Sequence, residues 1–308
     1  MAASAVAATT DGEAVVLTQP GEWLDLTRPQ AARRYDALLG GKDNFESDRA
    51  SAQQIRQELP SVDLAARELR RFLERVVHHL AADCGVRQFL DIGCGLPHAP
   101  NVPEIAQAVD PTTRVVYVDP DPLVGAHARA LLTSHPDGAA HFRSGGLNDL
   151  DAILADDTVR DLIDFTKPVA VLLLAVLHFV PDDQHAYDAL DHLRTALPPG
   201  SYVAVSHVTF DPLSADQADR LAKLADPGAG HGPFRARTHD QLTALLDGLE
   251  LLEPGVVSVV DWHPDREPRP QIGADQAVAY GALTLITLAT RDVGQPSTQE
   301  GQTADVAQ

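Results

Sequence analysis

The sequence predicts an α/β protein with a mainly parallel sheet that helices cover on both faces. From Gln88 onward, short runs of β-branched or aliphatic residues alternate with stretches of helical periodicity. Strands that alternate with helices are joined by right-handed crossovers, which makes the strands parallel. The run 169–174 is apolar at every position, which is typical of a central strand buried on both faces.

The alternation defines the elements of this α/β body in order. We expect strands at residues 88–92, 114–118, 140–143, 169–174 and 201–206. We expect helices at residues 102–109, 123–132, 149–154 with a continuation, and 184–197. In these helical stretches apolar residues recur every three or four positions and so share one face.

Elements outside the alternating region follow the same periods. Helical patterns cover residues 61–82, 217–224 and 239–246. Residues 249–260 and 281–289 have strand patterns and can pair as a hairpin. Their connection, residues 261–280, is rich in proline and charge, so we expect an irregular loop.

Composition divides the chain into four parts. Residues 1–20 and 292–308 lack apolar periodicity and are too polar to be buried, so we expect both ends to be disordered. We expect residues 21–85 to form a helical N-terminal segment. Residues 86–291 should form the ligand-binding body.

Charge and composition exclude several classes of protein. A chain of 308 residues with 44% hydrophobic and 22% charged residues has the composition of a globular protein. Its net charge of −20 would repel a phosphate backbone, so we expect no nucleic-acid partner. The longest apolar run, 168–180, contains His178 and is too short to span a membrane. The first basic residue is Arg28, so the positive region of a secretory signal is missing.

The metal-ligating residue types form no recognisable set. Cys84 and Cys94 lack the paired spacing of a zinc site and the density of a disulfide framework. The histidines do not combine with carboxylates at helical spacing. We therefore expect a cytoplasmic protein without a bound metal.

The loop after the first strand of the body is the first candidate site. Ligands of open parallel sheets bind at the carboxyl ends of strands, and here the chain reads Asp91-Ile-Gly93-Cys94-Gly95. The two glycines let a ligand approach the backbone closely. A dinucleotide site would have a third glycine and an immediate helix, but His98 occupies that glycine position, and nearby prolines delay the helix.

An acidic residue ends the next strand. Asp119, followed by Pro120, lies at the adjacent strand tip, where a carboxylate can accept hydrogen bonds from both ribose hydroxyls. Ribose recognition is shared by nicotinamide and S-adenosylmethionine enzymes. Asp91 favours S-adenosylmethionine, because that ligand carries a sulfonium and an ammonium group. A tight turn with a helix cap would explain the same residues without any ligand.

Several segments together resemble a known family. They are residues 88–97, 101–102, 114–119, 126–132, 169–178 and, most distinctively, Ala-Arg-Arg-Tyr-Asp-Ala-Leu-Leu-Gly-Gly-Lys-Asp-Asn-Phe at 32–45. Over residues 28–264 the chain is similar to an actinobacterial S-adenosylmethionine-dependent methyltransferase family long described as a domain of unknown function. The resemblance implies the Rossmann-like class I methyltransferase fold, with a seven-stranded sheet whose last strand is antiparallel. It also implies S-adenosyl-L-methionine as cofactor.

The cofactor residues follow from the strand tips and this resemblance. Relatives carry an acidic residue near the adenine after the third strand, where this chain has Gly146. Asn148 or Asp149 can take that role, or backbone groups can. The expected cofactor-binding residues are Asp91, Gly93, Cys94, Gly95, Asp119, Pro120, Asn148, Asp149 and Ala175.

Two histidines are candidates for catalysis. His178 follows the fourth strand and His207 ends the fifth, so both should project beside the cofactor. A histidine there can act as a general base toward a hydroxyl or amine. Each can equally cap a strand or pack beneath a loop. We expect a small-molecule acceptor with oxygen or nitrogen as the methylated atom.

Two other functions remain open from sequence. A catalytically silent S-adenosylmethionine-binding sensor or interaction protein would keep the cofactor pocket, and Gly146 keeps this alternative open. A nicotinamide oxidoreductase is disfavoured by the missing third glycine.

The N-terminal segment is expected to form a lid or cap over the cofactor. The residues assigned to the lid or the acceptor are Arg33, Tyr35, Gly40, Gly41, Lys42 and Asn44. A helix that ends at Gly40 would explain the glycines equally well.

Overall fold

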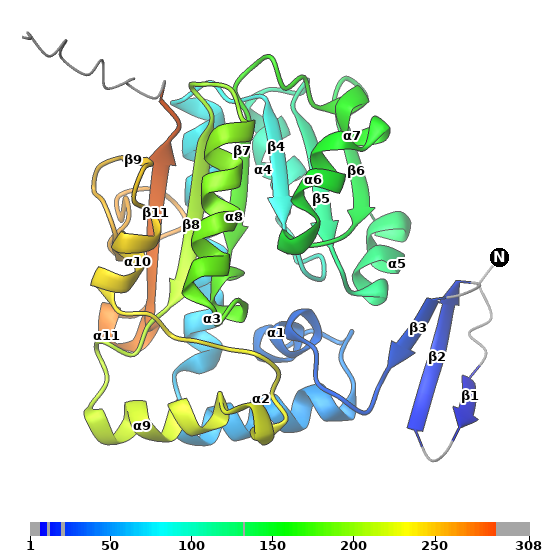
Figure 1. Ribbon diagram of the computed structural model, residues 1–308, viewed down its shortest axis with the longest axis vertical. Helices are drawn as coiled ribbons and strands as arrows, with labels where there is room; N and C mark the ends of the chain where they lie inside the picture. Colours follow the sequence, from blue (N-terminus) through cyan, green and yellow to red (C-terminus); the bar gives the residue numbers. More distant parts are fainter. Residues whose placement is uncertain (1–6, 11–12, 20–21, 132, 288–308) are drawn as a thin grey trace, which may run out of the picture.

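One mixed sheet forms the centre of the molecule (Figure 1). The computed structural model describes residues 7–10, 13–19, 22–131 and 133–287. The strand order of the main sheet is β10-β11-β8-β7-β4-β5-β6, and β9 also pairs with β11. The strands are β4 (Gln88–Ile92), β5 (Arg114–Asp119), β6 (Ala139–Ser144), β7 (Ala170–Leu174), β8 (Tyr202–Val208), β9 (Glu250–Leu251), β10 (Val257–Ser258) and β11 (Ala279–Leu285).

The direction of the strands confirms the predicted fold. Strands β6, β5, β4, β7 and β8 are parallel neighbours, whereas β11 runs antiparallel to β8. The sheet has eight strands rather than seven, because the stretch predicted as one strand forms two. A turn closed by the Gly255 N–H on the Leu252 carbonyl separates β9 from β10, and each of these pairs antiparallel with β11.

Side chains alternate between two cores, one on each face of the sheet. In β5, Val115 and Tyr117 join the core beneath α3 (Val62–Ala82) and α4 (Val102–Val109). Val116 and Val118 join the core beneath α8 (Asp183–Ala196) on the opposite face. Because successive strand residues point to opposite faces, an apolar run without alternation fills both cores.

The remaining helices surround this sheet. They are α5 (Pro122–Leu131), α6 (Leu150–Ala155), α7 (Asp157–Leu162), α9 (Ala215–Leu224), α10 (His239–Leu245) and α11 (Ala274–Ala277). The predicted irregular connection is irregular apart from α11. In the described part of the chain, no helix combines the length and hydrophobicity that a membrane span requires.

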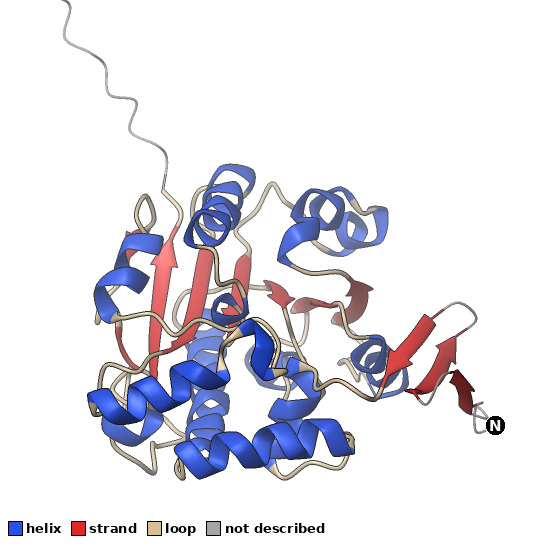
Figure 2. Ribbon diagram, turned by 60° about the horizontal axis from the view of Figure 1, so that its bottom comes forward, coloured by secondary structure: helices blue, strands red, loops and turns tan. Residues whose placement is uncertain are grey.

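A layer of helices covers the carboxyl edge of the parallel strands. Helices α1 (Ala31–Leu39) and α2 (Glu46–Glu58) lie there together with α9, and Figure 2 shows this layer in front of the strand ends. Helix α1 packs against α2 and α3, and α2 packs against α9. This layer gives the strand tips a roof.

A small antiparallel sheet precedes α1. It consists of β1 (Ala7–Thr10), β2 (Glu13–Gln19) and β3 (Glu22–Asp25). These strands differ from the disorder expected for residues 1–20. The stretch 13–19 contains two valines and a threonine, which favour extended backbone. The expected tail, residues 292–308, lies outside the described residues.

Candidate functional site

A cavity of about 700 Å³ lies between the strand tips and the helical roof. Its walls come from the loops that follow β4 to β8 and from helices α1, α3 and α9. Its volume is in the range that holds drug-sized ligands, about 300–1,000 Å³. All nine expected cofactor residues line it: Asp91, Gly93, Cys94, Gly95, Asp119, Pro120, Asn148, Asp149 and Ala175.

The loop after β4 needs its glycines for two different reasons. Gly93 and Gly95 have φ values of 74° and 67°, a left-handed conformation that favours glycine. A Cβ on Gly93 would lie 2.5 Å from Cγ2 of Val176, whereas a Cβ on Gly95 would meet no atom within 4 Å. Gly93 therefore permits close packing against the loop after β7, and Gly95 leaves the cavity open.

Asp119 is held by its own loop and the neighbouring one. Its Oδ2 accepts from the Gly95 N–H at 2.9 Å, and its Oδ1 accepts from the Asp121 N–H at 2.9 Å. Burial raises the pKa of Asp119 to about 6 despite these two hydrogen bonds. The carboxylate is thus fixed at the strand tip, with its oxygens directed to two loops.

Asp91 is a buried carboxyl group on the cavity wall. Burial raises its pKa to about 7, the charge of Asp119 adds to this rise, and Arg70 opposes it. Asp91 is 4% exposed. A cationic group placed in the cavity beside Asp91 would stabilise its ionised form.

The loops after β6 and β7 complete this half of the cavity. Asp149 Oδ2 accepts from the Gly146 N–H at 2.9 Å, which orders the loop that carries Asn148. Ala175 has φ of 58°, unusual for a residue with a side chain. Its N–H donates to Oγ of Ser206 at 2.9 Å, a contact that fixes this conformation.

The two candidate histidines occupy different places. His178 lines the cavity, is 4% exposed, and its Nδ1 is buried without a hydrogen-bond partner. Burial, with help from His207, Arg34 and Arg237, holds the pKa of His178 well below its usual range. The ring is therefore neutral at neutral pH, and a ring nitrogen can accept a hydrogen bond.

His207 does not line the cavity, in contrast to its predicted position. Its Nδ1 donates to the Val208 carbonyl at 2.7 Å, and its Nε2 accepts from Nη1 of Arg237 at 3.0 Å. Burial lowers the pKa of His207 to about 4. Strand β8 continues to Val208, so this histidine lies inside the strand instead of beyond its end.

The predicted lid residues fall into two groups. Arg33 and Tyr35 line the cavity from α1, whereas Gly40, Gly41, Lys42 and Asn44 lie outside it. Gly40 ends α1 with φ of 80°, as the alternative reading of the glycines predicted.

The residues outside the cavity enclose one carboxylate of α1. Asp36 Oδ2 accepts from Nδ2 of Asn44 at 2.6 Å and from the Asp43 N–H at 2.9 Å. His98 Nε2 lies 3.1 Å from Asp36 Oδ1, so α1 also contacts the end of the glycine loop. A Cβ on Gly41 would collide with this carboxylate, which explains the second glycine.

Comparison with known proteins decides the family. The family model described as S-adenosyl methyltransferase matches residues 18–287. The chain belongs to this family. Its cofactor is S-adenosylmethionine, and it is a methyltransferase.

In the described ranges, no three His, Cys, Asp or Glu side chains gather as metal ligands.

Two solved structures are similar over most of their length. A DUF574 family protein from Streptomyces avermitilis is 39% identical, with a TM-score of 0.79, over 84% of this chain and 98% of that chain. A candidate methyltransferase from Thermobifida fusca is 37% identical, with a TM-score of 0.77, over 86% of this chain and 97% of that chain. A search of curated proteins found no match.

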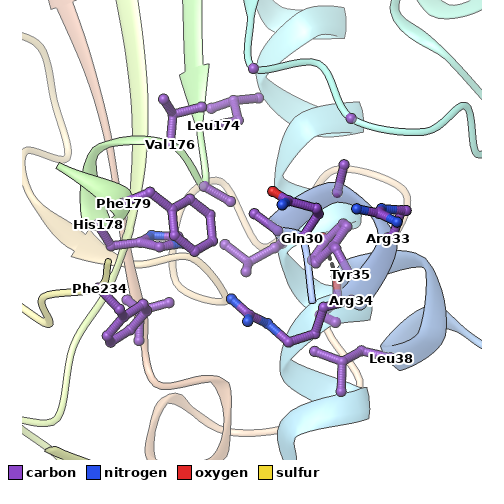
Figure 3. Close-up of a pocket in the computed structure, with 18 of the residues that line it drawn as sticks. Gln30, Arg33, Arg34, Tyr35, Leu38, Leu174, Val176, His178, Phe179 and Phe234 are labelled. Atoms are coloured by element: carbon purple, nitrogen blue, oxygen red, sulfur yellow. Dashed lines mark hydrogen bonds between the residues drawn. The ribbon is translucent and has the colours of Figure 1, made fainter. Parts of the chain in front are cut away.

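Several cavity residues of this methyltransferase were missed by the sequence analysis. Arg34, Phe179 and Phe234 line the half of the cavity around His178 (Figure 3), and His231 is also part of the cavity wall. Phe179 directly follows His178, so its place in the cavity wall could be predicted from the same strand end. Arg34 could be found from helical periodicity, because Arg34 and Leu38 lie one turn apart and both face the cavity.

Proposed function

We propose that this enzyme methylates an oxygen or nitrogen atom of a small molecule that lies beside the cofactor within the cavity. The observation that carries the proposal is that one cavity is lined both by the nine strand-tip residues and by an apolar and aromatic region around His178. A cavity of about 700 Å³ beneath a helical roof suits a small acceptor rather than a polymer.

The residues present fit S-adenosylmethionine. Each oxygen of Asp119 accepts one backbone hydrogen bond and keeps a further lone pair for a ribose hydroxyl. The ionised form of Asp91 suits the positive charges of the cofactor. Asn148 and Asp149 would face the adenine, and the open space at Gly95 would admit the ligand against the backbone.

The chain's own contribution to the reaction is mainly alignment. When bound, S-adenosylmethionine supplies an electrophilic methyl group, which the acceptor's lone pair takes while the C–S electron pair returns to sulfur. His178 would accept a hydrogen bond from the acceptor's O–H or N–H and receive that proton. Because the pKa of His178 is low, orienting the acceptor matters more than strong base catalysis.

The helical roof would exclude water and complete the site. Arg33 and Tyr35 contribute cavity wall from α1, and the Tyr35 hydroxyl donates to the Ala66 carbonyl at 2.8 Å. This contact anchors α1 on α3. We infer that residues 21–85 act as a cap over the cavity. The contact of Asp36 in this cap with His98 would keep the cap on the glycine loop.

Calorimetry and a transfer assay test the proposal. We expect S-adenosylmethionine and S-adenosylhomocysteine to bind and NAD not to bind. Label from methyl-labelled S-adenosylmethionine should then appear in a small hydroxy or amino compound. Binding of both cofactor forms without transfer to any acceptor in a broad collection would favour a silent sensor, and binding of NAD alone would refute the assignment of the site.

A further inference from the structure

Arg34 is a buried cation that forms no salt bridge with a described residue, although the charge of Asp48 acts on it from beyond 4.0 Å. Its side chain reaches from α1 into the half of the cavity around His178 (Figure 3), and the residue is 7% exposed. Its Nη1 donates to the His231 carbonyl at 2.7 Å and to Oγ of Ser51 at 3.4 Å. Among the residues that the structure describes, no carboxylate oxygen lies within 4.0 Å of its guanidinium, whereas the Arg33 guanidinium lies 3.2 Å from Asp121.

The free edge of this guanidinium is available to a ligand. In the described part of the chain, the side chain of Arg34 donates hydrogen bonds from Nη1 alone, which leaves Nε and Nη2 without one. Burial lowers the pKa of Arg34 and the charge of Asp48 opposes this, but an arginine stays charged in either case. A buried charge that no counter-ion contacts directly is costly. A planar guanidinium binds a carboxylate through two parallel hydrogen bonds. An anionic ligand would therefore supply the missing partner.

The surroundings of Arg34 are aromatic. The centre of its guanidinium lies 5.9 Å from the centroid of the Phe179 ring. The rings of Phe210 and Phe234 stack at 6.3 Å with 28° between their planes, and Phe234 lies 5.3 Å from the ring of His178. These rings form an apolar wall on which a flat ligand can pack.

We propose that the methyl acceptor is a small aromatic carboxylic acid. This inference rests on the proposed function and specifies its substrate class. The carboxylate pairs with Arg34, and the ring packs against Phe179 and Phe234. Arg34 and His178 both contact the Phe179 ring, so the same acceptor places its hydroxyl or amine at His178.

The carboxylate of the cofactor has a different candidate partner. Arg70 lines the cavity, and its charge lowers the pKa of Asp91 on the glycine loop. The charge of Arg34 instead lowers the pKa values of His178 and His231, on the opposite side of the cavity. The two cations therefore serve two different ends of the cavity.

A carboxylate fits better than a phosphate. The charge of Arg34 acts on two titratable side chains of the cavity wall, His178 and His231, and burial favours the neutral form of both. A phosphate monoester would bring about two negative charges at neutral pH to a single cation. The second charge would be buried without a partner.

Matched acids and amides test the proposal on protein saturated with S-adenosylhomocysteine. The probes are 4-hydroxybenzoate, 4-hydroxyphenylacetate and 6-hydroxy-2-naphthoate, each compared with its primary amide by calorimetry. We expect at least one acid to bind about tenfold more tightly than its amide, because hydrogen bonds to charged groups are the stronger ones. Arg34→Gln should abolish that preference, and Arg34→Lys should retain part of it.

Control variants separate this proposal from the proposed function. Arg160→Gln, at an exposed arginine of α7, should keep both the acid preference and the affinity for S-adenosylhomocysteine. Arg34→Gln should keep that affinity within about twofold while losing the acid preference. If Arg34→Gln does not fold, the ratio of acid affinity to amide affinity in the unmodified protein and in Arg34→Lys still tests the proposal.

Each contrary result has a distinct meaning. Failure of the unmodified protein to bind S-adenosylhomocysteine would refute the proposed function. Normal cofactor binding with no acid preferred over its amide would overturn the substrate class alone. A loss of cofactor affinity in Arg34→Gln as large as the loss of acid affinity would assign Arg34 to the cofactor carboxylate and overturn the proposal.

Discussion

The guanidinium of Arg237 lies 3.0 Å from Nε2 of His207 and donates to it. Arg237 also donates to the carbonyls of Leu177 and Val180, at 3.0 and 2.8 Å. These two residues flank the turn that carries His178. His207 therefore lies behind the cavity wall, next to the arginine that holds this turn, whereas His178 lines the cavity.

Replacing His178 should separate binding from turnover. In His178→Ala we expect the affinity for S-adenosylhomocysteine to change by less than about twofold. Turnover should fall about a hundredfold, the lower end of what a general base contributes, because the low pKa of His178 makes it a weak base. Calorimetry and initial rates measure the two quantities, and unchanged turnover would remove His178 from the mechanism.

Replacing His207 should change how stability depends on pH. The pKa of His207 is about 4 when folded and about 6.5 when unfolded, so the unfolded chain binds the proton first as pH falls. Its contribution to stability is therefore complete above pH 6.5 and is lost as pH falls toward 4. Urea unfolding at pH 7.5 and at pH 5.0 gives the decrease in the free energy of unfolding between these two pH values. This decrease should be about 2 kcal/mol smaller in His207→Gln than in the unmodified protein. Equal decreases in both proteins would contradict the assignment.

Cofactor affinity should fall as the solution becomes more acidic. The pKa values of Asp91 and Asp119 are about 7 and about 6, and the cationic cofactor favours their ionised forms. Below pH 7 binding must displace a proton, so the affinity should decrease from pH 8 to pH 6. Asp91→Asn should bind more weakly at pH 8 and show a flatter profile. An affinity independent of pH in the unmodified protein would exclude a role for these carboxylates.

The same substitution should stabilise the protein at high pH. The folded-state pKa of Asp91 is raised, so its ionisation opposes folding as pH rises from about 4 toward 7. Asp91→Asn removes that cost, which is on the order of 4 kcal/mol above pH 7. Thermal unfolding at pH 8 should therefore show a higher Tm in Asp91→Asn, and a lower Tm would show that Asp91 is paired when ionised.

Gly93 of the glycine loop and Gly228, which lies outside that loop, offer a test substitution and a control. In Gly93→Ala the new Cβ collides with Val176, and the left-handed backbone is strained by about 1–2 kcal/mol. We expect a lower Tm and a loss of cofactor affinity. Gly228→Ala, whose Cβ meets no atom within 4 Å, is the control and should change neither quantity. Equal behaviour of the two variants would show that the contact with Val176 is not needed.

The elements of the body were largely predictable from local pattern. The predicted bounds 88–92 and 102–109 match β4 and α4. Asn101 caps the start of helix α4, its N–H donates to Glu104, and such caps set helix ends locally. The strand-tip residues of the cofactor half were also predictable, because parallel strands present their carboxyl ends at one edge.

Side-chain directions that depend on packing were not predictable. The pairing of His207 with Tyr280 on β11 extends β8 past the predicted end, and this pairing joins residues far apart in the chain. The cavity-facing side of α1 depends on how α1 packs against α2 and α3. Helical periodicity places Arg34 and Leu38 on one face of α1, but which face of α1 meets the cavity depends on this packing.

Val176 packs directly on Gly93, so a shift of the glycine loop toward Val176 must also displace the wall that leads to His178. A ligand that shifts the loop also changes the shape offered to the second ligand. Such coupling is reciprocal: whatever factor the cofactor adds to the affinity of the acceptor, the acceptor adds to that of the cofactor. S-adenosylmethionine and S-adenosylhomocysteine differ by one methyl group and one positive charge. Conversion of S-adenosylmethionine to S-adenosylhomocysteine would then lower the affinity for the methylated product and assist its release.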